Sequence, residues 1–321
     1  MDEQNRITKI NPLLGWLLKG DSSVVYQTHR DLLGSDDRLL NRLRKDIAEN
    51  GWGRKFLDKR NKKNGMWGNG IYSPKWISTT YTILDLKNLG IHPETTEFVE
   101  SGKILIHELW GIPQNKKKRF LDLCICGMLL NLCCYAGINT QKIYEIINFI
   151  MEKQFPDGGW NCRWEIDKDH SSLHTTINIL EGLQEYLDNN YSYKRKEILS
   201  SIKKAHEFIL IHKLFKSDHT DKIIDKKMIM LSHPVRWRYD ILRCMDYFSA
   251  AGQKYDNRMK EALAIILKKK MKNNHWPVQQ KHSGIVHFTM EETGKESRWN
   301  TLRSLRVLKK YRKDEYLQLI G

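Results

Sequence analysis

One spacing of residues occurs three times in this chain, and it constrains the fold more than any other feature. The best-preserved copy is FIMEKQFPDGGW at residues 149–160; the others are FLDKRNKKNGMW at 56–67 and IILKKKMKNNHW at 265–276. Each has an apolar pair, a polar residue four positions later, Gly or Asn after four more, and Trp two residues after that. A turn that ends in a large aromatic side chain, repeated at fixed spacing, indicates a fold built from repeats.

A second pattern alternates apolar and polar helices. Three apolar stretches with amphipathic-helix spacing each open on a cation–Trp pair, at residues 75–76, 236–237 and 298–299. Apolar helices are predicted at 75–90, 119–137, 171–187, 236–252 and 298–311, and more polar ones at 94–110, 140–153, 192–213 and 256–272.

No segment alternates in the manner of a strand, so the helices must bury one another. A ring of about five to six helical hairpins, with apolar helices inside and amphipathic helices outside, achieves this. We therefore predict an all-α fold, an α/α toroid, as a single domain of residues 1–321. An N-terminal helical pair within residues 1–50 is expected to close the ring, and the repeats occupy 51–312.

The composition fits a packed protein and limits its partners. Ten Trp, thirteen Tyr and a hydrophobic fraction of 40% supply a sizeable core. The sequence shows neither a membrane-spanning apolar run nor a signal-peptide core, which predicts a cytoplasmic protein. The net charge of +16 is scattered over short lysine-rich runs. This disfavours nucleic acid as a partner without excluding it and leaves a peripheral membrane contact open. The sequence does not specify an oligomeric state.

The cysteines indicate core packing. Four of the six lie in the apolar pattern at 119–137, where Cys serves as a small buried residue. Their spacing matches neither a zinc ribbon nor a CxxC redox motif, so we predict reduced structural thiols.

The first pattern resembles the QW repeat of squalene–hopene cyclases and related terpene cyclases, and more broadly the prenyltransferase and squalene-oxidase repeat proteins. The resemblance covers about residues 50–312 and implies an α/α toroid with a central cavity. The chain is also similar to single-toroid bacterial proteins described as squalene-cyclase-like. Because fold does not imply function, the resemblance carries no established reaction with it.

Two departures separate the chain from these families. Squalene cyclases enclose substrate between two toroids, whereas this chain has the length of one. Protein prenyltransferases bind zinc through an Asp-x-Cys and a distant His. Asp122-x-Cys124 occurs here inside an apolar helix pattern, without the expected surroundings, so that metal site is not carried over.

In a toroid the inner helices begin around one mouth of the cavity, where their N-termini favour anions. The three cation–Trp pairs lie at these positions, which predicts a site for a small-molecule or lipid-like ligand with an anionic end. The alternative is that each Trp locks neighbouring hairpins while its cation stacks on a ring or pairs with an acid. The predicted ligand-binding residues are Lys75, Trp76, Trp164, Arg236, Trp237, Tyr239, Arg298 and Trp299.

The segment before the helix at 171–187 holds candidate catalytic groups. Terpene cyclases that start by protonation use a DxDD motif at this place, and the matching residues here read Asp167-Lys168-Asp169-His170. The resemblance makes Asp169 the proton donor, with His170 in place of the last Asp as its helper. The alternative is a solvated loop in which Asp169 caps the helix.

His170 and His174 are four residues apart and share a face if one helix contains both. With Cys162 they are the residue types of a zinc site, which a fourth ligand or water would complete. The alternative needs no cofactor and makes His174 a cavity-facing acid or base.

Two more carboxylates are candidate catalytic residues. Asp240 follows Arg236 by four residues, so it either pairs with Arg236 on a helix surface or faces the cavity. Glu291 lies in the long loop 277–297 beside His282 and His287, and loops of this length often bind ligands.

Three hypotheses follow. The first is an acid–base enzyme that acts on an isoprenoid-like or amphipathic anionic ligand. The second is a non-catalytic ligand-binding or scaffold toroid. The third is a lyase or hydrolase of a polar substrate. They differ in the cavity that they require: deep, aromatic and nearly dry for the first, and filled by side chains for a scaffold. The third requires one space shared by the side chains of His170, His174, Arg236, Asp240, Glu291 and Arg298.

Overall fold

The computed structural model describes residues 11–110, 121–166 and 170–321, and it is mostly helical. The prediction of an all-α protein is confirmed. The strands among the described residues are β1 (Trp276–Pro277) and β2 (Glu296–Ser297), which pair antiparallel with Trp276 opposite Ser297. None of the described helices has both the length and the apolar character needed to cross a lipid bilayer.

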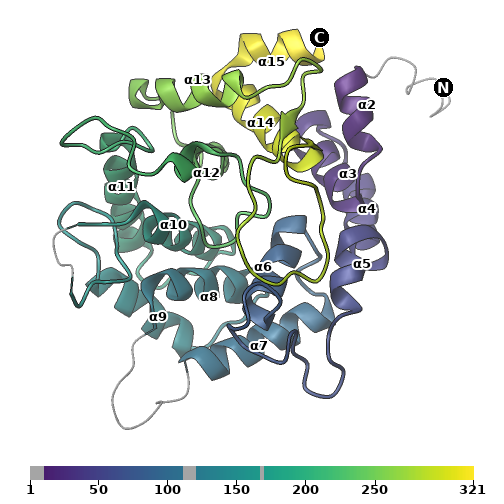
Figure 1. Cartoon of the computed structure of the whole chain (residues 1–321). Helices are drawn as coiled ribbons and strands as arrows, with labels where there is room; N and C mark the ends of the chain where they lie inside the picture. Colours follow the sequence, from purple (N-terminus) through teal and green to yellow (C-terminus); the bar gives the residue numbers. More distant parts are fainter. Residues whose placement is uncertain (1–10, 111–120, 167–169) are drawn as a thin grey trace.

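One set of helices lines a central cavity, and Figure 1 shows how these helices are arranged. In chain order these are α3 (Ser22–Thr28), α6 (Thr79–Leu89), α8 (Leu123–Tyr135), α10 (Leu173–Asp188), α12 (Ile241–Ala250) and α14 (Arg298–Tyr311). Helix α6 packs on α8, α8 on α10, α12 on α14, and α14 on α3. Helices from the start and the end of the chain therefore lie side by side.

The remaining helices lie outside this set. They are α2 (Pro12–Leu18), α4 (Asp37–Glu49), α5 (Gly51–Leu57), α7 (Thr96–Trp110), α9 (Gln141–Glu152), α11 (Arg195–Ile211), α13 (Lys260–Lys268) and α15 (Lys313–Ile320). Short π and 3-10 segments occupy His29–Leu33, Lys226–Ile229 and Asn257–Met259. The N-terminal region is thus more divided than the single helical pair predicted there.

The closest pairing in the core is between α8 and α10. Helix α8 is buried along almost its whole length, including its four cysteines. A Cβ atom on Gly127 would lie 2.5 Å from the carbonyl oxygen of Asn178, and one on Gly182 would meet the carbonyl of Gly127. Only glycine permits backbones to approach this closely.

The tryptophans of the repeated spacing make the same contacts in all three copies. Trp67, Trp160 and Trp276 are fully buried. Each indole Nε1 donates to a backbone carbonyl in the preceding helix, those of Phe56, Ile150 and Ile266, at 2.7–2.8 Å. Each backbone N–H donates to a threonine hydroxyl of the following inner helix, those of Thr79, Thr176 and Thr301, at 2.9–3.1 Å. The repeat is therefore a structural joint that ties an outer helix to the next inner one.

Two long loops lie against the first turns of the inner helices. In loop 277–297, Ile285 exchanges backbone hydrogen bonds with residues 75 and 76, and His287 contacts Thr82 of α6 at 3.0 Å. In the loop before α12, the N–H of Tyr239 donates to His174 of α10. The loops cross in front of the inner helices in Figure 1. They occupy the end at which the sequence predicted the mouth of the cavity.

Candidate functional site

The central cavity has a volume of about 650 Å³ and lies mostly between the C-terminal halves of the inner helices. Its lining is dominated by charged and amide side chains, and the loop before α12 forms its floor. The charged residues that line it are Arg30, Asp31, Asp85, Lys87, Glu181, Glu185, Asp188, Arg236, Arg243, Asp246, Arg303, Arg306, Lys309 and Lys310.

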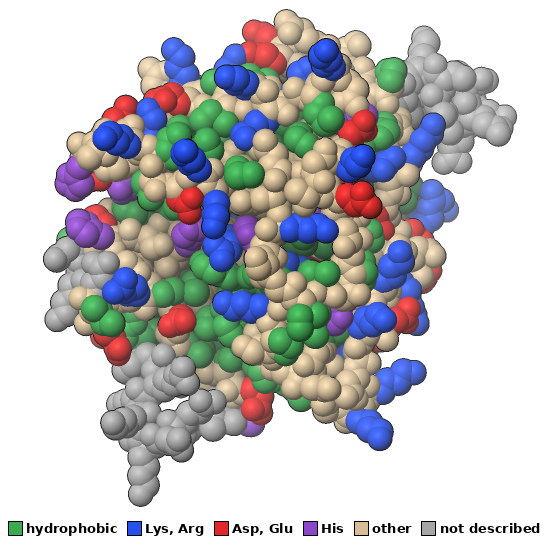
Figure 2. Space-filling view, viewed as in Figure 1, with side chains coloured by type: hydrophobic (Ala, Val, Ile, Leu, Met, Phe, Trp, Pro, Cys, Tyr) green, Lys and Arg blue, Asp and Glu red, His purple; other side chains and the backbone are tan. Residues whose placement is uncertain are grey.

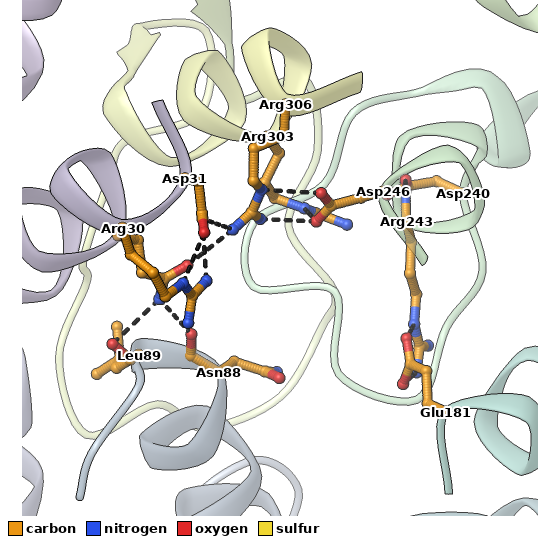
Figure 3. Close-up of polar contacts among 11 residues, drawn as sticks. Arg30, Asp31, Asn88, Leu89, Glu181, Asp240, Arg243, Asp246, Arg303 and Arg306 are labelled. Atoms are coloured by element: carbon orange, nitrogen blue, oxygen red, sulfur yellow. Dashed lines mark hydrogen bonds and ion pairs between the residues drawn. The ribbon is translucent and has the colours of Figure 1, made fainter. Parts of the chain in front are cut away.

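One wall carries a chain of ion pairs, drawn in Figure 3. Arg306 of α14 reaches Asp31 at 2.8 Å and Asp246 of α12 at 2.7 Å. Arg30 pairs with Asp31 at 2.6 Å, and Arg303 donates through Nε to Asp246 at 3.0 Å. Burial opposes ionisation of Asp31, but Arg306 and Arg30 hold the pKa of this carboxyl below its ordinary value.

The opposite wall holds a separate pair. Arg243 of α12 binds Glu181 of α10 through two parallel hydrogen bonds of 2.8 and 2.6 Å. Its remaining nitrogen donates to the backbone oxygen of Arg238 at 2.6 Å. This bidentate contact links α10 to α12 and leaves Arg243 with each of its nitrogens engaged.

The floor holds a buried carboxyl with weak support. Asp85 of α6 is 3% exposed, and Arg236 Nη2 lies 3.5 Å from its Oδ2. No group within the described residues donates a hydrogen bond to either carboxyl oxygen. Burial raises the pKa of Asp85 to about 6, although Arg236 acts in the other direction. A carboxyl with this pKa exchanges protons near neutral pH.

A buried histidine lies beside this pair. His233 stacks on Trp299 with ring centroids 5.3 Å apart, and both residues line the cavity. Its Nε2 has no hydrogen-bond partner among the described residues. Burial, followed by the charges of Arg303 and Arg236, lowers its pKa well below the ordinary value. His233 is therefore a buried, neutral imidazole.

Some of the residues predicted for ligand binding gather on the loop-covered end instead. The ammonium of Lys75 lies 5.8 Å from the Trp76 ring and 5.4 Å from the Trp237 ring. His174 packs edge-on against Trp237 at 5.6 Å. Figure 2 shows basic and histidine side chains together near the centre of this face. Of the predicted ligand-binding residues, only Arg236 and Trp299 line the cavity.

His174 has a structural contact that fixes its state. Its Nδ1 accepts the backbone N–H of Tyr239 at 2.9 Å, so the proton of the neutral ring is on Nε2. Burial, with smaller contributions from Arg238 and Arg243, lowers its pKa to about 4. Tyr239 is itself buried and donates to the carbonyl of Leu214 at 2.6 Å.

Three other predicted residues serve local structure. Arg298 stacks over Trp16 at 4.5 Å and donates to its carbonyl, away from the cavity. Asp240 caps α12 by accepting from the N–H of Arg243 at 2.8 Å, and it forms no ion pair with Arg236. Glu291 accepts from the N–H of Trp299 at 3.2 Å, next to the start of α14. Burial raises the pKa of both Asp240 and Glu291.

The segment expected to hold the proton donor contributes little to this cavity. Asp169 lies outside the described residues. His170 is exposed and precedes α10, so it does not share a helix face with His174. The sulfur of Cys162 accepts from the N–H of Cys124 at 3.2 Å and from the Thr175 hydroxyl. Within the described parts of the chain, no group of three or more His, Cys, Asp or Glu residues is arranged to hold a metal ion.

Trp164, also predicted to bind ligand, is half-buried outside the cavity. The ammonium of Lys153 lies 4.1 Å from its ring, and Phe149 packs edge-on against it. This cation–π contact fits the alternative interpretation, in which such aromatic residues join neighbouring elements.

Sequence reasoning missed most of the cavity residues. Asp85, Glu181 and Asp246 each interrupt an otherwise apolar face of a predicted inner helix. A charged residue at such a position indicates that the helix faces a polar cavity or that the residue forms a buried ion pair, because an unpaired charge in an apolar core is costly. His233 gave no comparable signal, since it lies in a loop.

Comparison of the chain with models of known protein families, with curated proteins and with solved structures finds no match. The case for a function therefore depends on the chain's own residues.

Proposed function

We propose that this protein is a single-ring α/α toroid whose central cavity binds a small, polar, anionic molecule, and that Asp85 acts as proton donor or acceptor in its conversion. The observation that carries the proposal is the state of Asp85. It is a fully buried carboxyl at the cavity floor, 3.5 Å from a guanidinium, with a pKa near 6. Groups perturbed in this way by burial and a specific charge partner are typical of catalytic sites.

The toroid part of the proposal draws on the helix arrangement. Six helices that alternate in sequence with outer ones line one cavity, and α14 returns to α3. The three equivalent Trp joints agree with the repeat that resembles the QW spacing of terpene cyclases. These contacts support a ring-shaped fold but do not indicate which reaction, if any, the protein catalyses.

The lining of the cavity favours a polar substrate over a hydrocarbon. Alkene protonation requires a dry, largely aromatic pocket, whereas charged residues dominate these walls. Apolar residues that an isoprenoid-like chain could contact, among them Leu89, Met290 and Trp299, are outnumbered in the lining by charged and amide residues. A pure scaffold is also less favoured, because open space remains at the centre of the ring.

The chemistry that fits these groups is proton transfer at a polar centre, as in a lyase or hydrolase. Asp85 with a pKa near 6 is available in both protonation states around neutral pH. Arg236 beside it stabilises the ionised carboxylate or a negative charge that develops on the substrate.

The proposal is tested with the purified full chain and two variants. Carboxylated and phosphorylated sugars, hydroxy acids and prenyl phosphates are incubated with the protein, and products are followed by NMR. We expect conversion of a polar compound that Asp85→Asn lowers at least about 100-fold. Asp58→Asn, which changes an exposed carboxyl, should leave it intact.

The ionisation of Asp85 is tested separately by carboxyl ¹³C NMR, with a resonance assigned through Asp85→Asn. A midpoint near pH 6 supports the proposal. A midpoint near 4, full activity of Asp85→Asn, or conversion of prenyl phosphates alone would each contradict it.

A further inference from the structure

Cys162 differs from the other cysteines of the chain in its exposure. The other five are buried, four of them in α8 and one in α12. Cys162 is half-buried in the loop between Trp160 and α10, and it does not line the central cavity. It is therefore the most solvent-exposed of the six cysteines.

Two donors converge on the Cys162 sulfur. The backbone N–H of Cys124 donates to it at 3.2 Å. Cys124 is the second residue of α8, so this N–H has no carbonyl partner within its own helix. The Thr175 hydroxyl, in the first turn of α10, lies 3.4 Å from the same sulfur. Because this oxygen accepts the N–H of Cys162 at 3.3 Å, its own hydrogen is available to the sulfur.

This arrangement favours the thiolate of Cys162. Donors that point at a sulfur stabilise its negative charge, and the positive end of the α8 dipole adds to their effect. The Cys124 thiol, followed by the Thr175 hydroxyl and the Cys124 N–H, holds the pKa of Cys162 below its ordinary value. Burial and the charge of Asp122 act in the opposite direction. Cys162 thus combines partial exposure with thiolate character, as reactive cysteines do.

A second cysteine lies directly beside this sulfur. The Cys162 sulfur is 3.2 Å from the backbone nitrogen of Cys124, so it lies within about 4.7 Å of the Cα atom of Cys124. Disulfides join residues whose Cα atoms are about 4.4–6.8 Å apart, which brings the Cys124 side chain within reach. Cys126 is fully buried and directs its thiol to the carbonyl of Leu121 instead.

We propose that Cys162 and Cys124 form a dithiol–disulfide pair in which Cys162 is the thiol that a hydroperoxide oxidises. The Cys162 sulfur attacks one peroxide oxygen, the O–O bond breaks, and the alkoxide or hydroxide that leaves takes up the proton lost by the thiol. The Cys124 sulfur then attacks the sulfenic acid on Cys162, the S–S bond forms, and water leaves with the Cys124 proton. Two thiols are oxidised and one peroxide is reduced. This pair lies outside the central cavity and does not depend on the proposed function.

The reactivity of Cys162 is tested by iodoacetamide alkylation of the folded full chain, followed over time by mass spectrometry of tryptic peptides. Cys162 is the only cysteine in the peptide 154–163. We expect alkylation with a pH midpoint below about 8.5, the value of a free thiol. Thr175→Val should slow it about fivefold at pH 7, because the thiolate loses one donor. Thr175→Ser keeps the hydroxyl and should keep the rate.

The disulfide is tested by treating the full chain with one equivalent of hydrogen peroxide, blocking the remaining thiols and digesting without reduction. We expect a Cys124–Cys162 crosslink, localised by peptide fragmentation, that dithiothreitol removes. Cys124→Ser should abolish the crosslink and leave Cys162 as a sulfenic acid that dimedone traps. Cys126→Ser is the matched control, because it changes a cysteine of the same helix and should leave the crosslink intact.

Several results would overturn the pair. They are a pH midpoint at or above about 8.5 for Cys162, alkylation no faster than that of the buried cysteines, absence of a crosslink in the wild-type protein, and a crosslink from Cys162 to Cys126. A loss of reactivity in Thr175→Ser equal to that in Thr175→Val would overturn the role of the hydroxyl. Urea unfolding shows which variants are folded, and crosslink mapping of the wild-type protein decides if a variant is not.

Discussion

The carboxylate of Asp85 is buried, and neither of its oxygens accepts a hydrogen bond from the described residues. A buried acid costs free energy when it ionises, and one long contact to Arg236 repays only part of that cost. The sign of its effect follows from its pKa, which burial raises from 3.8 in the unfolded chain to about 6 in the folded protein. Between these values the folded state holds a proton that the unfolded state has released, so this group's contribution to stability falls as pH rises.

Asp85→Asn should therefore stabilise the protein at neutral pH. The shift from 3.8 to about 6 corresponds to about 3 kcal/mol in the free energy of unfolding. We expect the variant to exceed the wild type by up to about this amount above pH 7 and by almost nothing below about pH 3, where Asp85 is protonated in both states. Urea unfolding of both proteins at several pH values measures the difference between their free energies of unfolding. The buried histidines contribute equally to both proteins, so their contributions cancel in this difference.

The matched control is Asp58→Asn, because Asp58 is exposed and pairs with Arg54 on a helix surface. Its effect should be below about 0.5 kcal/mol and should not change sign with pH. An Asp85→Asn variant that is less stable than the wild type at pH 7.5 would show that Asp85 is a supporting residue rather than a strained functional one.

At the scale of elements, the repeat spacing predicted helix positions well because it reflects contacts between residues that are close in the sequence. Each Trp, its carbonyl partner and its threonine lie within about one helix–loop–helix unit, so a local pattern could reveal them. Helix types and most helix positions followed from the same local periodicity.

The starts of two inner helices were predicted too early, for a physical reason. Arg236 has a φ of +56°, a left-handed conformation that no α-helix contains, and α12 begins only after the cap at Asp240. Likewise α6 begins at Thr79, after Ser78, although the apolar pattern extends back to Trp76. The pattern counted buried loop residues as helical ones, because both are apolar.

The threonine of each joint should matter equally in different repeats. Thr176→Val and Thr301→Val keep the side-chain shape but leave the buried N–H of Trp160 or Trp276 without its hydroxyl acceptor. Each should lower the free energy of unfolding by about 1–3 kcal/mol, measured by urea denaturation. Thr289→Val, at an exposed position, is the control and should change it by less than about 0.5 kcal/mol. If both threonine variants lost no more stability than Thr289→Val, these hydroxyl groups would not stabilise the contact between the outer and inner helices.

At the scale of the whole molecule, the candidate site depends on contacts between distant parts of the sequence. Its floor combines α6, the loop before α12 and α14, and its wall joins α14 to the N-terminal region. No local pattern specifies which charged residue of one helix meets which residue of another. The sequence therefore indicated a central cavity but placed its ligand-binding residues at the end that the loops cover.

The contact between α3 and α14 joins the first and last of the cavity-lining helices, and Arg306 is its principal polar link. Its guanidinium bridges Gln27 and Asp31 on one side and Asp246 on the other. Arg306→Met should leave these acids with fewer cationic partners and lower the free energy of unfolding by about 3 kcal/mol. Because the loss falls on the contact between α3 and α14, amide hydrogen exchange should rise in α3 and α14 before it rises in α8.

Arg258→Met is the matched control, since Arg258 makes comparable ion pairs with Glu207 and Asp256 at the surface. It should cost less than about 1 kcal/mol and leave exchange in α3 unchanged. If Arg306→Met instead raised exchange uniformly along the chain, the helices that line the cavity would unfold as one cooperative unit. Protection confined to α8 and α10 in the variant would show that the buried Gly127–Gly182 pairing persists after the contact between α3 and α14 is lost.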